Sequence, residues 1–160
     1  MDQVFSHLDA SGAARMVDVS AKADTVRRAI ARSRVEFSPQ TFALLQNKAL
    51  PKGDVLAVAK VAGIMAAKKT AELIPLCHPV ALSSVQVDFI LHEDVSSLEI
   101  VAEARAVGPT GVEMEALVAA QVAALTVYDM CKAVQRDIRI TDCRLLHKSG
   151  GKSGTYQAVE

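Results

Sequence analysis

The segment that most constrains this fold is residues 111–137, which read GVEMEALVAAQVAALTVYDMCKAVQRD. Between Ala116 and Tyr128 the only polar residues are Gln121 and Thr126, so a helix formed here is apolar nearly all round. Such a helix must be covered on most of its faces. We therefore expect it to lie either in the core or at an interface between copies of the chain.

Strand signals lie on both sides of this segment. In residues 27–37, Arg28, Arg32 and Arg34 alternate with small or apolar residues, which predicts a strand with one basic and one apolar face. Residues 83–93 and 96–108 also alternate, and a turn between them predicts a hairpin. The β-branched content of other segments adds two more strands. The predicted strands are 13–22, 27–37, 83–93, 96–108 and 138–146.

Two further helices are predicted between the strands. Ser38 is a suitable N-cap for a short helix over 38–50, because Pro39 follows at the first helical position. A longer helix is predicted over 54–73, with an apolar stripe on Val55, Val58, Ala62, Met65 and Ala66. The order of strands and helices predicts an α+β fold, in which helices pack on one face of an antiparallel sheet.

Length and charge limit the classes of protein that the chain can belong to. Its 160 residues fit one domain over 1–160, with a flexible N-terminus over about 1–12 and a mobile C-terminal segment over about 148–160. Eighteen basic residues balance eighteen acidic ones, so the footprint of a nucleic-acid-binding protein is missing. Three widely spaced cysteines argue against a disulfide framework. Without a signal peptide or a long apolar run, we expect a cytoplasmic protein and no membrane partner.

Charged residues at the two ends of the 111–137 helix are the first candidates for chemistry. Asp129 and Lys132 lie three residues apart on one face, either as an acid and a base or as an ordinary ion pair at the end of a helix. Glu113 and Glu115 stand in the first turn, where carboxylates complement the helix dipole. The same carboxylates could instead bind the guanidine edge of a purine or pterin through two hydrogen bonds. The residues alone leave both choices open.

Two loops carry further candidates. In LCHPV, Cys77 and His78 are adjacent, which is a poor arrangement for a metal chelate, so we expect no metal site there. His78 could bind phosphate or transfer a proton, or it could make one structural hydrogen bond. Lys52 precedes a helix in PKGD and is by itself an ordinary surface charge.

Near the C-terminus, LLHKSGGKSG over 145–154 invites comparison with a P-loop. The P-loop pattern requires glycine at position 146, where this chain has leucine, and it requires a helix after the loop. Both conditions fail, which removes the expectation of an ATPase or GTPase. The remaining possibilities are a polar tail or a flexible loop whose amides, serines, Lys148 and Lys152 wrap an oligophosphate.

Five segments together resemble the MoaC family of cyclic pyranopterin monophosphate synthases in molybdenum cofactor biosynthesis. They are SHLDASGAARMVDVSAK, LIPLCHPV, GVEMEALVAA, ALTVYDMCKAV and LLHKSGGKSG, and the resemblance extends from about Ser6 to Gln157. It implies a ferredoxin-like subunit in a hexamer, a trimer of dimers, with active sites between subunits. It also implies the substrate, 3',8-cyclo-7,8-dihydroguanosine triphosphate, and a functional link to the radical enzyme that makes it. No redox cofactor is implied, and Mg²⁺ with the triphosphate stays open.

The resemblance also implies roles for single residues. Asp129 and Lys132 become the acid and base, with the pKa of the lysine lowered by burial, and Lys52 becomes a second proton donor or a phosphate ligand. Glu115 is assigned to the purine-derived ring, and His78, Lys148 and Lys152 to the triphosphate. The predicted substrate-binding residues are Leu76, Cys77, His78, Glu113, Met114, Glu115, Lys148 and Lys152.

One position departs from the pattern of the family, and one rival class of protein stays open. Pro109 stands in GPTGVEM where many relatives are expected to have lysine, so it provides neither a charge nor an amide donor. The rival is an oligomeric accessory protein that holds a nucleotide or pterin for a partner enzyme without performing chemistry. An interfacial nucleic-acid binder is disfavoured by the zero net charge and by the few aromatic residues.

Overall fold

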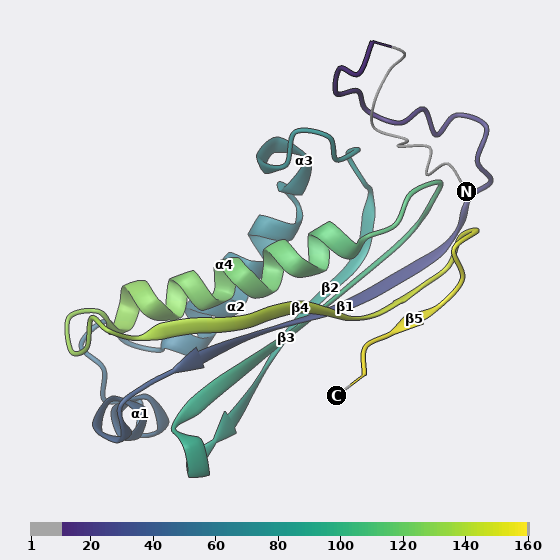
Figure 1. Ribbon diagram of the computed structural model, residues 1–160. Coiled ribbons are helices and arrows are strands. Elements are labelled where there is room, and N and C mark those ends of the chain that lie inside the picture. Colours follow the sequence, from purple (N-terminus) through teal and green to yellow (C-terminus); the bar gives the residue numbers. More distant parts are fainter. Residues whose placement is uncertain (1–10, 160) are drawn as a thin grey trace.

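The computed structural model of the chain describes residues 11–159 as one curved antiparallel sheet with helices packed on one face (Figure 1). The strand order across the sheet is β2-β3-β1-β4-β5. The flexible segment predicted for 1–12 lies outside the described residues, except for its last two. In chain order the elements are β1 (Thr25–Glu36), α1 (Pro39–Gln46), α2 (Val55–Ala67), α3 (Thr70–Leu73), β2 (Leu82–His92), a short 3₁₀ turn (Glu93–Val95), β3 (Ser97–Gly108), α4 (Glu113–Cys131), β4 (Arg139–Ser149) and β5 (Tyr156–Gln157).

The predicted α+β class with an antiparallel sheet is confirmed. Strand β1 pairs with β3 on one side and with β4 on the other, and β2 and β3 form the predicted hairpin. The chain order β1, α1 to α3, β2, β3, α4, β4 and the central position of β1 and β3 are compatible with a ferredoxin-like arrangement. Residues 148–160, predicted to be mobile, include the end of β4 and the short strand β5, which pairs with it.

The alternation in β1 separates a buried face from a charged one. Ala29, Ala31, Ser33 and Val35 are fully buried beneath the helices. On the opposite face, the arginines of β1 form ion pairs with neighbouring strands. These pairs are Arg28 with Glu103 (2.6 Å), Arg32 with Asp142 (2.6 Å) and Arg34 with Glu99 (3.3 Å). The basic face predicted from the sequence is therefore a face of paired charges rather than a free positive surface.

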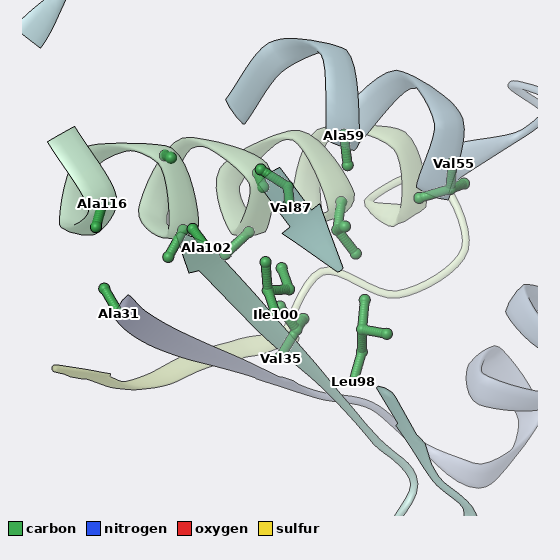
Figure 2. Packing of buried hydrophobic residues seen from close by; sticks show 14 of the residues in the cluster. Ala31, Val35, Val55, Ala59, Val87, Leu98, Ile100, Ala102 and Ala116 are labelled. Atoms are coloured by element: carbon green, nitrogen blue, oxygen red, sulfur yellow. The ribbon is translucent and has the colours of Figure 1, made fainter. Parts of the chain in front are cut away.

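Packing between α4 and its neighbours is made of very small side chains. Buried alanines recur on α4 at helical spacing, and they meet the inner face of the sheet, where Ala31, Ala102, Ile100, Val35 and Leu98 point toward the helix (Figure 2). Helix α2 packs so closely on α4 that a Cβ on Gly63 would lie 2.9 Å from the carbonyl oxygen of Ala119. By length and composition α4 could cross a membrane, but half of its apolar window is buried within this chain.

Two sequence predictions for secondary structure were wrong. Residues 15–24 contain no strand, because β-branched residues form one only when a neighbouring strand pairs with them. The helix predicted over 54–73 is divided into α2 and α3, and the hydroxyl of Thr70 donates to the carbonyl of Ala67 (3.0 Å) at the break. Its buried face also differs from the predicted stripe. That face comprises Val55, Ala59, Gly63, Ala66 and Ala67, whereas Val58 and Met65 are about half exposed.

Candidate functional site

A cavity of about 420 Å³ lies at the N-terminal end of α4. The loop before β2 and the first turn of α4 form two of its walls, and the segment before β1 forms a third. It brings together six residues that the sequence predicted to bind substrate: Leu76, Cys77, His78, Glu113, Met114 and Glu115. These residues are up to 39 positions apart in the chain, so the sheet and α4 place them together. We refer to this space as the first cavity.

Glu115 is the most unusual group in the first cavity. Only 4% of the residue is exposed, and its carboxyl accepts from its own backbone N–H but from no side chain among residues 11–159. Burial raises the pKa of Glu115, and the neighbouring charge of Glu113 raises it further. A buried carboxyl with one backbone donor keeps further acceptor sites unpaired, which is costly unless a ligand provides donors. The carboxyl is therefore suited to a ligand that carries N–H groups.

The loop residues Cys77 and His78 close the first cavity in different ways. Burial raises the pKa of the Cys77 thiol, and the charge of Glu115 adds to the effect, so this thiol is not activated as a nucleophile. Nε2 of His78 lies 2.7 Å from the carbonyl oxygen of Val17. Because a carbonyl only accepts, Nε2 carries the proton in this bond. His78 thus holds the segment before β1 against the cavity.

A second cavity of about 740 Å³ adjoins the first and shares Lys22, Thr110, Gly111 and Glu113 with it. Its other walls include Arg27 and the glycine loop, which we define as residues 149–153. Of the two lysines predicted to bind phosphate in this region, Lys152 lines the second cavity. Lys148 does not line it, because its Nζ donates to Ser153 Oγ and to the carbonyl of Gly154 (2.9 Å).

The predicted catalytic residues lie together at the other end of α4. Lys132 Nζ lies 2.7 Å from Asp129 Oδ1, and Lys52 Nζ lies 2.9 Å from Asp129 Oδ2 and 3.0 Å from the Asp129 carbonyl oxygen. We call these three residues the Asp129 cluster. All three side chains are between 42% and 54% exposed. The structure therefore joins Lys52 to the predicted acid and base, although 77 positions separate it from Asp129.

The pKa predicted for Lys132 was wrong. We expected burial to lower it, but the ammonium is half exposed and bound to Asp129, which raises the pKa of Lys132. Hydrogen bonds from Lys132 first, and from Lys52 second, lower the pKa of Asp129 to about 2. In the chain by itself, Asp129 and Lys132 are therefore both charged near neutral pH.

Residues of the cavities lie at the N-terminal end of α4 and Asp129 lies at its C-terminal end, so the length of the helix separates them; Figure 1 shows the course of α4. From Glu113 to Asp129 the helix rises roughly 24 Å, at 1.5 Å per residue. A small molecule held by Glu115 thus cannot contact Asp129 of the same chain. Apart from Lys148, the predicted residues lie in two groups, one at each end of α4, and a single chain does not bring these two groups together.

Sequence reasoning missed two basic residues of the second cavity, Arg27 and Lys22. A signal for Arg27 was present, because in the alternation of 27–37 it falls in the set that contains Ala29 and Ala31 and hence on the buried face. Lys22 carries no comparable signal, since it stands in a segment without regular structure. Among residues 11–159, no group of three or more His, Cys, Asp or Glu side chains is placed to hold a metal ion.

The fold and cavities define an α+β protein with a buried carboxyl in one cavity and basic side chains around the next. Residues 16–151 match the model of the MoaC family, and the chain belongs to this family. It is 61% identical over 158 residues to a cyclic pyranopterin monophosphate synthase of Oleidesulfovibrio alaskensis, with 99% of each chain covered. The protein of that name from Nitratidesulfovibrio vulgaris is 61% identical, with 96% of each chain covered. The one from Chloroflexus aurantiacus is 59% identical, with 96% of this chain and 94% of the relative covered.

Proposed function

We propose that the chain is a cyclic pyranopterin monophosphate synthase of molybdenum cofactor biosynthesis. Its substrate is 3',8-cyclo-7,8-dihydroguanosine triphosphate, which it rearranges to cyclic pyranopterin monophosphate with release of pyrophosphate. The names of relatives that match almost the full length support this proposal. The structural observation that carries it is the buried carboxyl of Glu115 in the first cavity, which no side chain among residues 11–159 pairs. The enzyme works in the cytoplasm and receives its substrate from a radical enzyme.

The first cavity accommodates the purine-derived ring. The guanine-type edge presents a ring N–H beside an amino group, and a carboxylate accepts from both with two parallel hydrogen bonds. Such bonds also offset the cost of burying Glu115. The remaining walls, formed by Leu76, Cys77 and Met114, offer the apolar contacts that a flat ring requires.

The second cavity accommodates the triphosphate. It adjoins the first cavity, and Lys22 and Lys152 on its walls carry charges opposite to those of phosphate. Lys148 now binds its own loop and becomes a phosphate ligand only if Ser153 and Gly154 give up their contacts with it. His78 holds Val17 in the free chain and becomes a phosphate ligand only if it gives up this hydrogen bond.

The Asp129 cluster provides proton transfer. The reaction opens and recloses a heterocycle, and a hydroxyl then attacks the α-phosphate, so that a new O–P bond forms as the bond to pyrophosphate breaks. The carboxylate of Asp129 accepts a proton, while the ammonium groups of Lys132 and Lys52 donate protons or neutralise developing charge. No electron transfer is needed at any of these steps.

The two groups of residues meet only if copies of the chain assemble. We infer that the Asp129 cluster of one copy faces the cavities of another, in a ferredoxin-like subunit of a hexamer arranged as a trimer of dimers. The separation along α4 supports this inference. Exposed apolar side chains on α2, including Val58, Val61 and Met65, offer a surface for such contacts.

The decisive assay gives purified chain the cyclic guanosine triphosphate substrate and measures released pyrophosphate. Release that depends on enzyme concentration, together with formation of the pterin product, supports the synthase. The accessory-protein alternative predicts tight binding of the substrate with no release, and that result would replace the proposed function.

A second experiment tests whether two copies build one site. Asp129→Asn chains, impaired in turnover, and Glu115→Gln chains, impaired in affinity, are unfolded together and refolded as mixed oligomers, and activity is measured at a substrate concentration where each variant alone is nearly inactive. If the site combines two chains, mixed dimers contain one intact site, and activity returns to a substantial fraction of the wild type. Mixed oligomers with no activity would show that both residues must come from one chain.

A further inference from the structure

Arg27 is a buried guanidinium at the floor of the second cavity. It lies in β1 and is 8% exposed. Nε donates to the carbonyl of Gly108 (3.0 Å) and Nη2 donates to the carbonyl of Pro109 (2.9 Å). No carboxylate among residues 11–159 forms an ion pair with it, whereas Arg28, Arg32 and Arg34 of the same strand are all paired. Within residues 11–159, Arg27 is therefore paired with two carbonyl groups and with no carboxylate.

The third edge of this guanidinium faces the glycine loop. Gly150 and Gly151 have φ values of +97° and +74°, which glycine adopts without strain. A Cβ on Gly151 would overlap Nη1 of Arg27, and a Cβ on Gly150 would overlap the carbonyl oxygen of Val26. The loop can lie this close to Arg27 only because both positions are glycine.

Arg27 consequently connects two walls of the cavity that are distant in sequence. Its Nε and Nη2 hold the turn before α4 through Gly108 and Pro109, and its Nη1 supports the glycine loop. We propose that Arg27 is a phosphate-site residue of this protein, which sets the geometry of the second cavity and provides its fixed positive charge for an oligophosphate. This inference rests on the proposed function and adds a residue to which the sequence assigned no role.

The charges around the cavity favour an anion over a neutral ligand. Lys22 and Lys152 are exposed and can move, while Arg27 is immobilised by its two carbonyl partners. Glu113 is the acidic group on the walls, and it lies where the two cavities meet. A buried cation without a counterion is costly, and a phosphate oxygen offsets this cost through charge-assisted hydrogen bonds. In this chain Arg27 thus provides charge beside Pro109, where a lysine was expected.

The experiment measures binding of inorganic tripolyphosphate to the full-length oligomer by calorimetry, in wild type and in Arg27→Gln. We expect Arg27→Gln to weaken binding by about 10- to 100-fold, as for loss of a charged hydrogen-bond partner. Arg28→Gln is the matched control, because the adjacent arginine lies on the opposite face and pairs with Glu103. It removes the same charge and should leave affinity unchanged. Equal affinity of wild type and folded Arg27→Gln, or equal losses in both variants, would overturn the proposal.

Two more variants keep the test decisive if Arg27→Gln does not fold. Arg27→Lys retains the charge but cannot hold both carbonyls, so we expect an intermediate loss. Gly151→Ala leaves all charges in place and displaces the loop from Nη1, so tripolyphosphate affinity should fall several-fold in the folded protein, beside a loss of thermal stability from the positive φ at this position. A folded Gly151→Ala that binds like the wild type would refute the role of Arg27 in setting the cavity.

Turnover separates this inference from the proposed function. With the cyclic triphosphate substrate, Arg27→Gln should raise KM more than it lowers kcat, whereas a merely structural role would lower the amount of folded enzyme and leave KM unchanged. An inactive wild type whose tripolyphosphate binding still depends on Arg27 would contradict the synthase and support the phosphate site. An active wild type whose tripolyphosphate binding does not depend on Arg27 would support the synthase and contradict the phosphate site.

Discussion

The two ends of α4 place the same chemical group in opposite environments. At the N-terminal end, Glu115 is buried in a cavity, lacks a side-chain donor among residues 11–159, and has a raised pKa. At the C-terminal end, Asp129 is half exposed, accepts from two lysines, and has its pKa lowered to about 2. The carboxyl of Glu115 needs hydrogen-bond donors from a ligand, whereas the carboxylate of Asp129 already accepts hydrogen bonds from two ammonium groups. The comparison shows that burial and partners, rather than residue type, decide what each carboxyl can do.

The two ends of α4 also differ in whether one chain by itself forms an enclosed site. The binding end has walls on several sides and a buried polar group, as ligand sites in proteins commonly do. The Asp129 cluster lies on the surface, where solvent weakens its electrostatics. A second copy that covers the cluster would remove this solvent and strengthen its interactions.

The largest effect is expected at the exposed end. Asp129→Asn should lower kcat by about 10²- to 10⁴-fold, the range for loss of a proton-transferring group, as measured by pyrophosphate release. The melting temperature should stay close to that of the wild type, since the side chain is exposed. Asp137→Asn, on the exposed turn after α4, is the control and should remain active. Full activity of Asp129→Asn would exclude Asp129 as an acid or base.

At the buried end, Glu115→Gln should mainly change affinity. We expect binding of GTP, a non-reacting molecule with the same guanine edge, to weaken by about 10- to 100-fold because a charged acceptor is lost. The preference for GTP over ATP should decrease in parallel in calorimetric titrations. Glu72→Gln, an exposed change on α3, should leave both affinities unchanged. Undiminished selectivity in Glu115→Gln would place the ring elsewhere.

Between the two ends, Gly63→Ala should affect stability rather than binding. Its Cβ would crowd the backbone carbonyl of Ala119, and overpacking of this kind costs about 1–3 kcal/mol in the free energy of unfolding. Chemical denaturation measures the loss. Affinity for GTP in the folded fraction should be unchanged, because neither end of α4 is altered. A stabilised variant would mean that α2 and α4 can separate without cost.

The raised pKa of Glu115 predicts a pH-dependent difference in stability. A carboxyl whose pKa is raised on folding contributes its stability below its unfolded value, near 4.5, and loses it as the pH rises through its folded value. Glu115→Gln should therefore melt a few degrees above the wild type at neutral pH. The difference should disappear below about pH 4.5. An equal difference at both pH values would assign the effect to packing.

The smallest effect concerns the partners of Asp129. For this acid, whose pKa is lowered, the stability contribution is present above the ordinary value of 3.8 and is lost as the pH falls through about 2. Lys132→Met should shift the Asp129 pKa upward more than Lys52→Met, because Lys132 contributes more. Carboxyl chemical shifts followed by NMR in the substrate-free protein measure both variants. A larger shift in Lys52→Met would reverse the ranking.

Local patterns predicted most of the elements, because their causes are local. The alternation of β1, the N-cap at Ser38, the β2–β3 hairpin and the helix after Gly111 all depend on neighbours in sequence. The failures depend on distant partners. Residues 13–22 have strand composition, but no strand pairs with residues 15–24. The face of α2 was misjudged because α4 accepts only small side chains, which favours Ala59 and Gly63 over the larger Val58.

In the candidate site, too, some features could be predicted from the sequence and others depend on the fold. Family motifs predicted the residues of the first cavity and of the Asp129 cluster, and the structure brings together the members of each. Their roles in catalysis stay predictions. The pKa of Lys132 could not be obtained from its apolar neighbours in sequence, because exposure at the end of a helix depends on the surrounding fold. The alternation of β1 indicates that Arg27 is buried, but its two carbonyl partners, some 80 positions away, could be identified only from the fold.

The close contact between α2 and α4 has a mechanical consequence. Alanine and glycine side chains leave no room for local bending, and rigid backbones in contact transmit displacement as one body. Helix α4 is therefore a rigid element that keeps the distance between the cavities and the Asp129 cluster constant in every copy. Any closing motion around a bound molecule must then come from the loops, above all 15–24 and 149–153, or from rotation of whole chains against one another.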